Sequence, residues 1–144
     1  ELNSMTWNDN SSFVSAMYYR IYYQITLANE FLRYTDSQWM DDHSFSDQEK
    51  IMIVDMAAEA RFLRALSYYH ALDLFGNVPF VDETYNPGLF FPQQIMRKDL
   101  FNWILAELNN IEPLLKPALT VDYGRADRGA LLALRSKLYL NSEV

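Results

Sequence analysis

A tryptophan and two asparagines near the start of the chain are the side chains best suited to binding a polar ligand. Trp7 is followed by Asn8 and Asn10, in a segment that precedes the first predicted helix. The indole offers an apolar platform, and the side-chain amides offer hydrogen-bond donors and acceptors, which is the mixture that sites for polar organic ligands contain. We expect these three residues to contact a ligand; the alternative, an ordinary packed tryptophan, stays open.

Paired carboxylates could perform glycoside hydrolysis, but their placement here does not favour it. Asp55 and Glu59 are one helical turn apart, and Asp73 follows on the same predicted helix. Glycosidases place two carboxyl groups on either side of the scissile bond. Carboxylates in a row along one helix instead mark a solvated face, where like charges repel modestly. The sequence also has no Gly-x-Ser-x-Gly and no glycine-rich phosphate loop, so we predict that the protein is not an enzyme.

The residues that bind metals are too few and too scattered to predict a metal site. The two histidines, His43 and His70, lie on different segments, and the chain has no cysteine. An acidic loop at residues 41–49 lacks the alternating ligands and central glycine of a calcium-binding EF-hand. We therefore expect neither a metal nor a cofactor, and assign the loop carboxylates to helix capping and solvent.

Composition and charge exclude several classes of partner. Twelve Lys and Arg against nineteen Asp and Glu give a net charge of −7. An acidic chain does not favour nonspecific binding to nucleic acid or to anionic lipid, because both need clustered cations. Half of the residues are hydrophobic and 15% are aromatic, and only four are glycine. That composition is typical of a globular, helical chain rather than of a disordered or an all-β one.

Four helices must position these side chains, and the fold class we predict is all-α. Apolar residues recur at helical spacing in four segments, which we place at residues 12–40, 46–75, 92–112 and 127–140. Ser46 and Glu49 form a capping box at the start of the second helix, and Gly76 followed by Pro79 marks its end. A long connection with glycines and prolines, residues 76–92, separates the two pairs of helices.

The order of the elements predicts two helical hairpins of the tetratricopeptide type. Small and aromatic residues at positions 58, 62 and 65, and large apolar residues at 101, 104 and 108, have the spacing of such repeats. On the second helix we expect Ala57 and Ala60 to line a close contact between helices. Trp103 lies at helical spacing among leucines and isoleucines, so we expect it in the core.

Four sequence blocks, in order along the chain, resemble the SusD/RagB family. The most specific is EARFLRALSYYHALDLFGNVPFV at residues 59–81, which carries Glu59, Arg61, Arg64, Gly76 and Pro79. The other three blocks are Tyr22-x-x-Ile25-x-x-x-Asn29; Arg97 with Ile104 and Leu108, where Glu107 stands for the usual Asp; and Gly124-Arg125-Ala126 with Gly129-Ala130 and Leu138-Tyr139-Leu140. Signature residues of this kind can be architectural, and we expect Glu59 to pair with Arg61 or Arg64.

The resemblance implies a function as well as a fold. Proteins of this family are outer-membrane lipoproteins of Bacteroidetes that capture glycans, without catalysis, and present them to a SusC-like TonB-dependent transporter. Residues 1–144 would then form one tetratricopeptide-like helical region of a longer, surface-exposed lipoprotein, with the lipid anchor outside this segment. The alternative from periodicity alone is a helical-repeat scaffold for protein–protein interaction.

Overall fold

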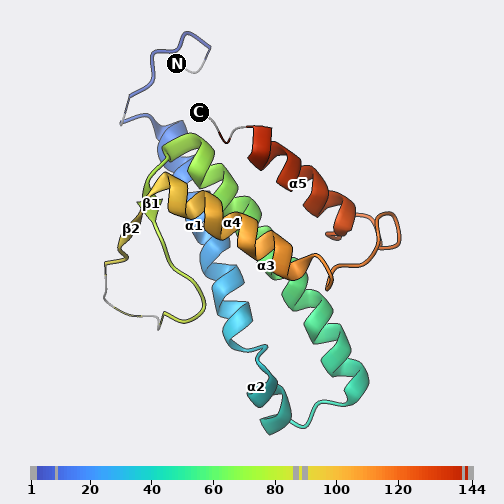
Figure 1. The fold of residues 1–144 in the computed structure, drawn as a ribbon. Coiled ribbons are helices and arrows are strands. Elements are labelled where there is room, and N and C mark those ends of the chain that lie inside the picture. The colour runs from blue at the N-terminus through green and yellow to red at the C-terminus, as the bar shows by residue number, and fades with distance from the viewer. Residues whose placement is uncertain (1–2, 9, 86–87, 89–90, 141, 143–144) are drawn as a thin grey trace.

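The computed structural model describes residues 3–8, 10–85, 88, 91–140 and 142, and it confirms the all-α fold (Figure 1). The helices of these residues are α1 (Ser12–Arg33), α2 (Ser37–Asp42), α3 (Asp47–Phe75), α4 (Arg97–Ile111) and α5 (Arg128–Leu140). Two strands of two residues each, β1 (Val78–Pro79) and β2 (Gln94–Ile95), form a small antiparallel sheet. Within this part of the chain, no helix is long and apolar enough to cross a membrane.

The first predicted helix is divided in two, so the expected boundary at residue 40 is wrong. α1 ends at Arg33, and a new helix, α2, begins at Ser37. The division is local in origin, because Asp36 takes an extended conformation and its carboxylate accepts a hydrogen bond from the Trp39 amide at 2.7 Å. An aspartate that caps a helix in this way favours a new start over continuation of the previous helix.

Both ends of α3 follow the predicted signals. The Ser46 hydroxyl accepts from the Glu49 amide while the Glu49 carboxylate accepts from the Ser46 amide, which completes the capping box. At the other end Gly76 has φ of 72° and ψ of −100°, a conformation that L side chains rarely adopt. The glycine therefore lets the chain leave the helix and turn toward β1.

The third predicted helix begins later than expected, at Arg97 rather than near Pro92. Residues 94–95 pair with β1, with Val78 opposite Ile95 and Pro79 opposite Gln94, and the Phe80 amide donates to the Gln93 carbonyl at 3.0 Å. This pairing keeps the chain extended up to Met96, which caps α4. The apolar run after Gly76 thus has a strand partner that is distant in sequence, and no local signal shows it.

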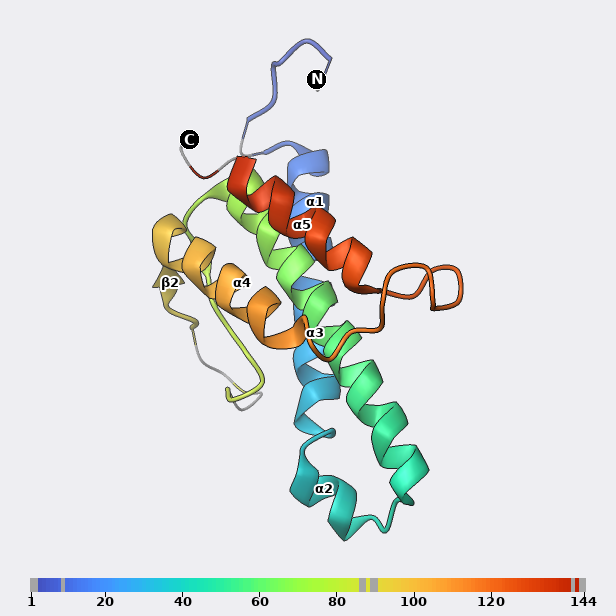
Figure 2. The same ribbon diagram turned by 45° about the vertical axis from the view of Figure 1, so that its right-hand side comes forward.

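α3 is the central helix of the molecule, because it packs against α1 on one side and α4 on another, and α5 contacts both α3 and α4 (Figure 2). α3 therefore has two buried faces. Ala58, Ala65 and Ala71 are fully buried, whereas Ala57 and Ala60 are only half-buried. Ala57 and Ala60 thus lie at the edge of the buried faces and not at their centre, and Ala60 lines a groove beside α1.

The remaining expectations concern α4 and α5. Trp103 is half-buried and packs edge-on against Tyr68, with ring centroids 5.2 Å apart, so it lies at the border of the core rather than inside it. Asp127 caps α5 as predicted, because its carboxylate accepts from the Ala130 amide at 2.9 Å. The core joins apolar residues of α1, α3, β1, α4 and α5 with Leu115.

Candidate functional site

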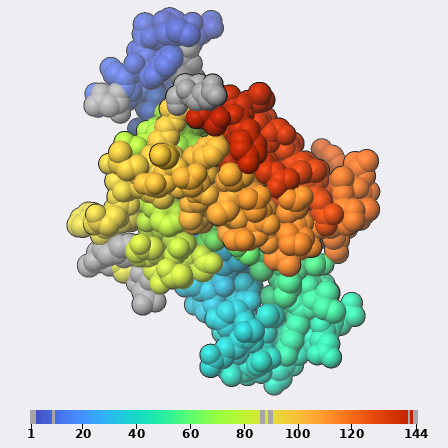
Figure 3. Space-filling model, viewed as in Figure 1, coloured from blue at the N-terminus to red at the C-terminus, as the bar shows by residue number. Residues whose placement is uncertain are grey.

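Trp7 lies beside an apolar hollow at the N-terminal end of α1. The hollow has a volume of about 330 Å³, and its lining includes Trp7, Phe13 and Met17 together with Leu74 and Phe75 from the end of α3. The Trp7 side chain is 48% exposed. Figure 3 shows the N-terminal segment at one end of the molecule, with α2 and the start of α3 at the other. The indole is therefore partly packed and partly open to solvent, which leaves a surface for a ligand.

The two asparagines accompany Trp7, and one of them shapes the turn into α1. The Asn8 side-chain oxygen accepts from the Asn10 amide at 3.0 Å, and the Asn8 carbonyl accepts from the Ser11 amide at 3.0 Å. Asn8 and Asn10 are both exposed. The structure thus brings the three predicted residues together on one short turn, although the Asn8 oxygen already has a hydrogen bond.

Two residues that line this hollow were not predicted from the sequence to be exposed. Phe13 and Met17 continue the apolar stripe of α1, which predicts that they are core residues, yet Phe13 is 62% and Met17 is 47% exposed. The stripe is buried only from Ile21 onward, where α3 covers it. Hydrophobic periodicity predicts which face of a helix is apolar, but it does not predict how far along the helix a neighbouring helix covers that face.

A charged cluster is buried between α1, α3 and α4. Arg64 is 2% exposed, and its guanidinium donates to Asn29 Oδ1 at 2.7 Å, to Glu107 Oε1 at 2.8 Å and to the Glu83 carboxylate. Arg61 donates to both oxygens of Glu107, at 2.9 and 2.7 Å. The guanidinium of Arg64 also lies 5.4 Å from the centre of the Trp103 ring. The Arg64 guanidinium is thus surrounded by two carboxylates, an amide oxygen and a flat ring, which fix its orientation, while Glu107 also binds Arg61 in a bidentate manner.

The cluster favours the ionised form of Glu107. Burial alone would raise the pKa of Glu107, but the hydrogen bonds and charges of Arg61 and Arg64 outweigh it, so the pKa of Glu107 is lowered. Burial likewise opposes the charge on Arg64, yet its bonds to Glu83 and Glu107 raise the pKa of Arg64. The arrangement therefore contains an anion and its counter-ions, not a protonated acid that could donate a proton to a substrate.

The cluster and its neighbours clamp the segment of residues 79–85, which we call the arm. Side chains of α1 bind every second carbonyl of the arm: Tyr22 donates to Pro79 at 2.7 Å, Asn29 to Val81 at 3.1 Å, and Arg33 to Glu83 at 3.2 Å and to Tyr85 at 3.0 Å. From α3, the Tyr68 hydroxyl donates to the Val81 carbonyl at 2.7 Å and accepts from the Val81 amide at 2.8 Å. The arm ends in a turn, in which the Tyr85 amide donates to the Asp82 carbonyl at 3.3 Å, and α1 binds carbonyls both before and within this turn.

The four sequence blocks that carry the family resemblance meet in space. Asn29, Arg64 and Glu107 belong to three of them and share the buried cluster. The fourth joins through Arg125, whose guanidinium donates to both oxygens of Glu59, at 2.8 and 2.5 Å. Glu59 thus pairs with Arg125, and the expected pairing of Glu59 with Arg61 or Arg64 is wrong. Gly76 and Pro79 of the same signature shape the turn into β1.

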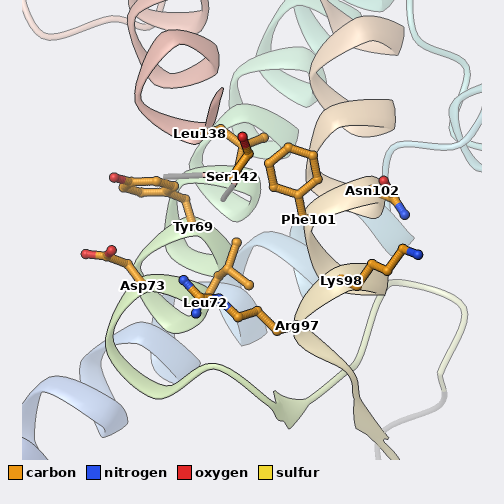
Figure 4. A pocket seen from close by; sticks show the side chains of 9 residues that line it. All are labelled: Tyr69, Leu72, Asp73, Arg97, Lys98, Phe101, Asn102, Leu138 and Ser142. Carbon is orange, nitrogen blue, oxygen red and sulfur yellow. The ribbon is translucent and has the colours of Figure 1, made fainter. Parts of the chain in front are cut away.

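A larger hollow of about 510 Å³ lies between α3, α4 and α5 (Figure 4). Tyr69 and Phe101 stand on opposite sides of it, with Leu72 and Leu138 between them, while Lys98 and Asn102 point away from its centre. Its walls are therefore mainly apolar, although Ser142 lies between Tyr69 and Phe101, where its hydroxyl donates to the Tyr139 carbonyl at 2.8 Å. Such a hollow suits an apolar group better than a sugar, whose hydroxyls need several partners inside the site.

The comparison with known proteins relates the chain to one group. It is 36% identical over 144 residues to the starch-binding protein SusD of Bacteroides thetaiotaomicron. Among solved structures, a SusD homologue from the same species matches 93% of this chain with a TM-score of 0.73 and 25% identity, and a laminarin-binding SusD-like protein matches 87% with a TM-score of 0.70 and 28% identity. No family model matches. The chain belongs to the SusD family.

Membership of the SusD family agrees with the fold of this chain, but most of the length of each relative lies outside the matched region. This SusD-family chain spans 24% of the length of the starch-binding protein and 26% of each of the two solved structures. The relatives are named as binding proteins, for starch in one case and laminarin in another. In the part of the chain that the structure describes, no group of three histidine, aspartate or glutamate side chains is placed to hold a metal ion.

Proposed function

We propose that the chain is the helical region of a non-enzymatic glycan-binding protein. In this proposal residues 1–144 form one tetratricopeptide-like region, and the whole protein presents an oligosaccharide or polysaccharide to a SusC-like TonB-dependent transporter. It would stand at the surface of the outer membrane on a lipid anchor outside this segment. The names of the relatives, which refer to starch and laminarin, support glycan as the class of ligand.

The observation that carries the proposal is the exposed indole of Trp7 with its neighbouring amides. A flat aromatic face suits the apolar face of a sugar ring, and the side chains of Asn8 and Asn10 can bond its hydroxyls. All three residues lie outside the helical core, on a turn that leaves them exposed. A ligand can therefore bind there without disturbing the packing of α1 and α3.

The state of the carboxylates supports binding without turnover. A glycosidase needs one carboxylic acid whose pKa is raised so that it can protonate the leaving oxygen. Here Glu59 pairs with Arg125, Glu83 with Arg64, and Glu107 with two arginines, and the pKa of Glu107 is lowered. Each of these carboxylates is thus used to hold one part of the chain to another.

The proposal is tested with the whole protein to which this segment belongs. Isothermal titration with starch and laminarin oligosaccharides should detect binding, and chromatography of the same mixtures should detect no shortened products. Trp7→Ala should weaken binding by about 5- to 150-fold, which corresponds to roughly 1–3 kcal/mol for an aromatic that stacks on a flat ligand. Tyr123→Ala, which removes a fully exposed ring from the loop before α5, is the matched control.

The outcomes separate the elements of the proposal. Unchanged affinity in Trp7→Ala would remove this residue from the binding site, and released products would contradict a non-enzymatic role. Presentation to a transporter is tested by co-purification of the tagged protein with the TonB-dependent transporter from outer membranes. Absence of the transporter from such preparations would contradict that part alone.

A helical-repeat scaffold for protein–protein interaction is the second candidate. Tyr19, Tyr23, Leu27 and Phe31 form an exposed apolar row along α1 at intervals of four residues. Tyr23, Leu27 and Phe31 of this row line a shallow groove of about 700 Å³, together with Ala60 and Leu63 of α3. A protein that binds none of the glycans, but loses a protein partner in Leu27→Asp, would favour this alternative.

A further inference from the structure

A small hollow lies where the arm, β2 and the first turn of α4 meet. Its volume is about 220 Å³, and its lining includes Phe80 and Tyr85 from the arm, Gln93 and Gln94 from the β2 region, and Asp99 from α4. This is below the range of about 300–1,000 Å³ typical of pockets for drug-sized ligands. The hollow therefore fits a single ring rather than a longer ligand.

The side chains around the hollow match the chemistry of a sugar. Tyr85 is 40% exposed and can offer a ring face, while Phe80 is half-buried and forms the apolar floor against Tyr68, with ring centroids 5.3 Å apart. The two glutamines carry amides that donate and accept, and Asp99 carries a carboxylate that accepts. A sugar ring has an apolar face and hydroxyls that both donate and accept, so each kind of group has a partner.

The charge of the hollow selects among sugars. Asp99 is an acidic residue, and none of the described residues that line the hollow is a lysine or an arginine. A uronic acid or a sulfated sugar would bring a second negative charge close to this carboxylate, which is unfavourable in a partly desolvated site. A neutral saccharide unit is thus the class that fits.

The clamp on the arm holds one wall of the hollow in place. Arg33 binds the carbonyls of Glu83 and Tyr85, and Tyr68 and Asn29 bind Val81. Behind them stands the buried cluster of Arg64 and Glu107, and buried ion pairs of this kind are weak contributors to stability because of their desolvation cost. What the cluster does provide is a fixed position for an exposed segment, which is what a binding site requires.

We infer that this hollow is a subsite for a neutral saccharide unit, separate from the turn that carries Trp7. Figures 1 and 2 show β2 and the N-terminal segment in different parts of the molecule, and among the residues that the structure describes the two hollows share no lining residue. The inference rests on the proposed glycan-binding function and adds a second place of contact and a class of sugar to it.

The test uses the whole protein and titration with maltooligosaccharides and laminarin oligosaccharides, which are neutral, and with oligogalacturonides, which are acidic. Tyr85→Ala and Gln93→Ala should each weaken binding of the neutral series at least about fivefold. Arg33 binds the main-chain carbonyl of Tyr85, so this anchor of the arm is kept in Tyr85→Ala, and the melting temperature of each variant is measured beside the titration. Tyr123→Ala is the control, since it removes an equally accessible ring elsewhere.

Each outcome decides between the subsite and the function on which it rests. If the parent protein binds the neutral series and both variants bind equally well, the subsite is overturned while the glycan-binding function stands. If the parent binds only the acidic series, the assignment to a neutral sugar is overturned. If the parent binds no glycan in either series, the proposed function is overturned and the subsite with it.

Discussion

The hydroxyl of Tyr68 is the single atom on which the hold on the arm can best be tested. Its ring is fully buried, and its oxygen contacts both the amide and the carbonyl of Val81, at 2.8 and 2.7 Å. Tyr68→Phe removes this oxygen and keeps the ring, with its contacts to Phe80 and Trp103. The change therefore removes hydrogen bonds without creating a large cavity.

The magnitude follows from what each group of Val81 retains. Its carbonyl still accepts from Asn29 at 3.1 Å, so it keeps one partner. Its amide loses the Tyr68 oxygen, and a buried donor without a partner costs about 1–3 kcal/mol. We expect Tyr68→Phe to lower the free energy of unfolding by about 2 kcal/mol. For a chain of this size that corresponds to a fall in melting temperature of roughly 4–8 °C.

Urea denaturation followed by circular dichroism measures the free energy of unfolding, and hydrogen exchange measures the opening of the Val81 amide. Tyr22→Phe loses the bond to the Pro79 carbonyl and the hydroxyl contact with Tyr18, but it leaves no main-chain amide without a partner, so it should cost less, about 0.5–1.5 kcal/mol. Tyr123→Phe, at a fully exposed site, should cost nothing measurable. A Tyr68→Phe variant as stable as the parent, with unchanged exchange at Val81, would refute the reasoning.

Two further predictions concern stability. Gly76→Val should lower the free energy of unfolding, measured by urea denaturation, by about 1–2 kcal/mol, because φ of 72° strains a β-branched residue even though open space surrounds the new side chain. Gly88→Val, at a glycine without positive φ, is the control. Equal effects of the two substitutions would refute the assigned strain. Because the pKa of Glu107 is lowered in the fold, its contribution to stability is present above the ordinary glutamate pKa of about 4.3 and is lost as pH falls through the lowered value. Glu107→Gln should therefore be less stable at pH 7 and show a flatter loss of stability below about pH 4; parallel curves for variant and parent would contradict this.

Signals that reside in a few neighbouring residues predicted the structure well. The start of α3 at Ser46, its end at Gly76 and the cap of α5 at Asp127 depend on side chains within three or four positions of the helix end. The same kind of signal was present at Asp36, but the apolar stripe runs on to Met40 and favoured one long helix. Where a capping residue predicts a new helix and an apolar stripe predicts that the first helix continues, only the packing of the neighbouring helix decides between them.

Features that depend on distant parts of the chain could not be predicted. The pairing of β1 with β2 delays the start of α4, and the partners are about sixteen residues apart. Leu63 and Arg64 fit the helical stripe of α3 about equally well, and only the placement of Glu83 and Glu107 makes the arginine the buried one. At the predicted site, Trp7, Asn8 and Asn10 are adjacent in sequence, and so their proximity was certain; the contribution of Leu74 and Phe75 was not.

The way in which α1 and α3 hold the arm has a consequence for how the protein can diverge. Most of the hydrogen bonds go to main-chain carbonyls at residues 79, 81, 83 and 85, which every amino acid possesses. Some side chains of the arm also take part: Glu83 binds Arg64, the Thr84 hydroxyl donates to Asp82 at 2.6 Å, and the Phe80 ring packs on Tyr68. The remaining side chains of the arm can change by mutation while these main-chain bonds hold the path of the backbone. A segment that is held by its backbone can acquire new ligand preferences through single substitutions, and the variants along the way can all remain folded.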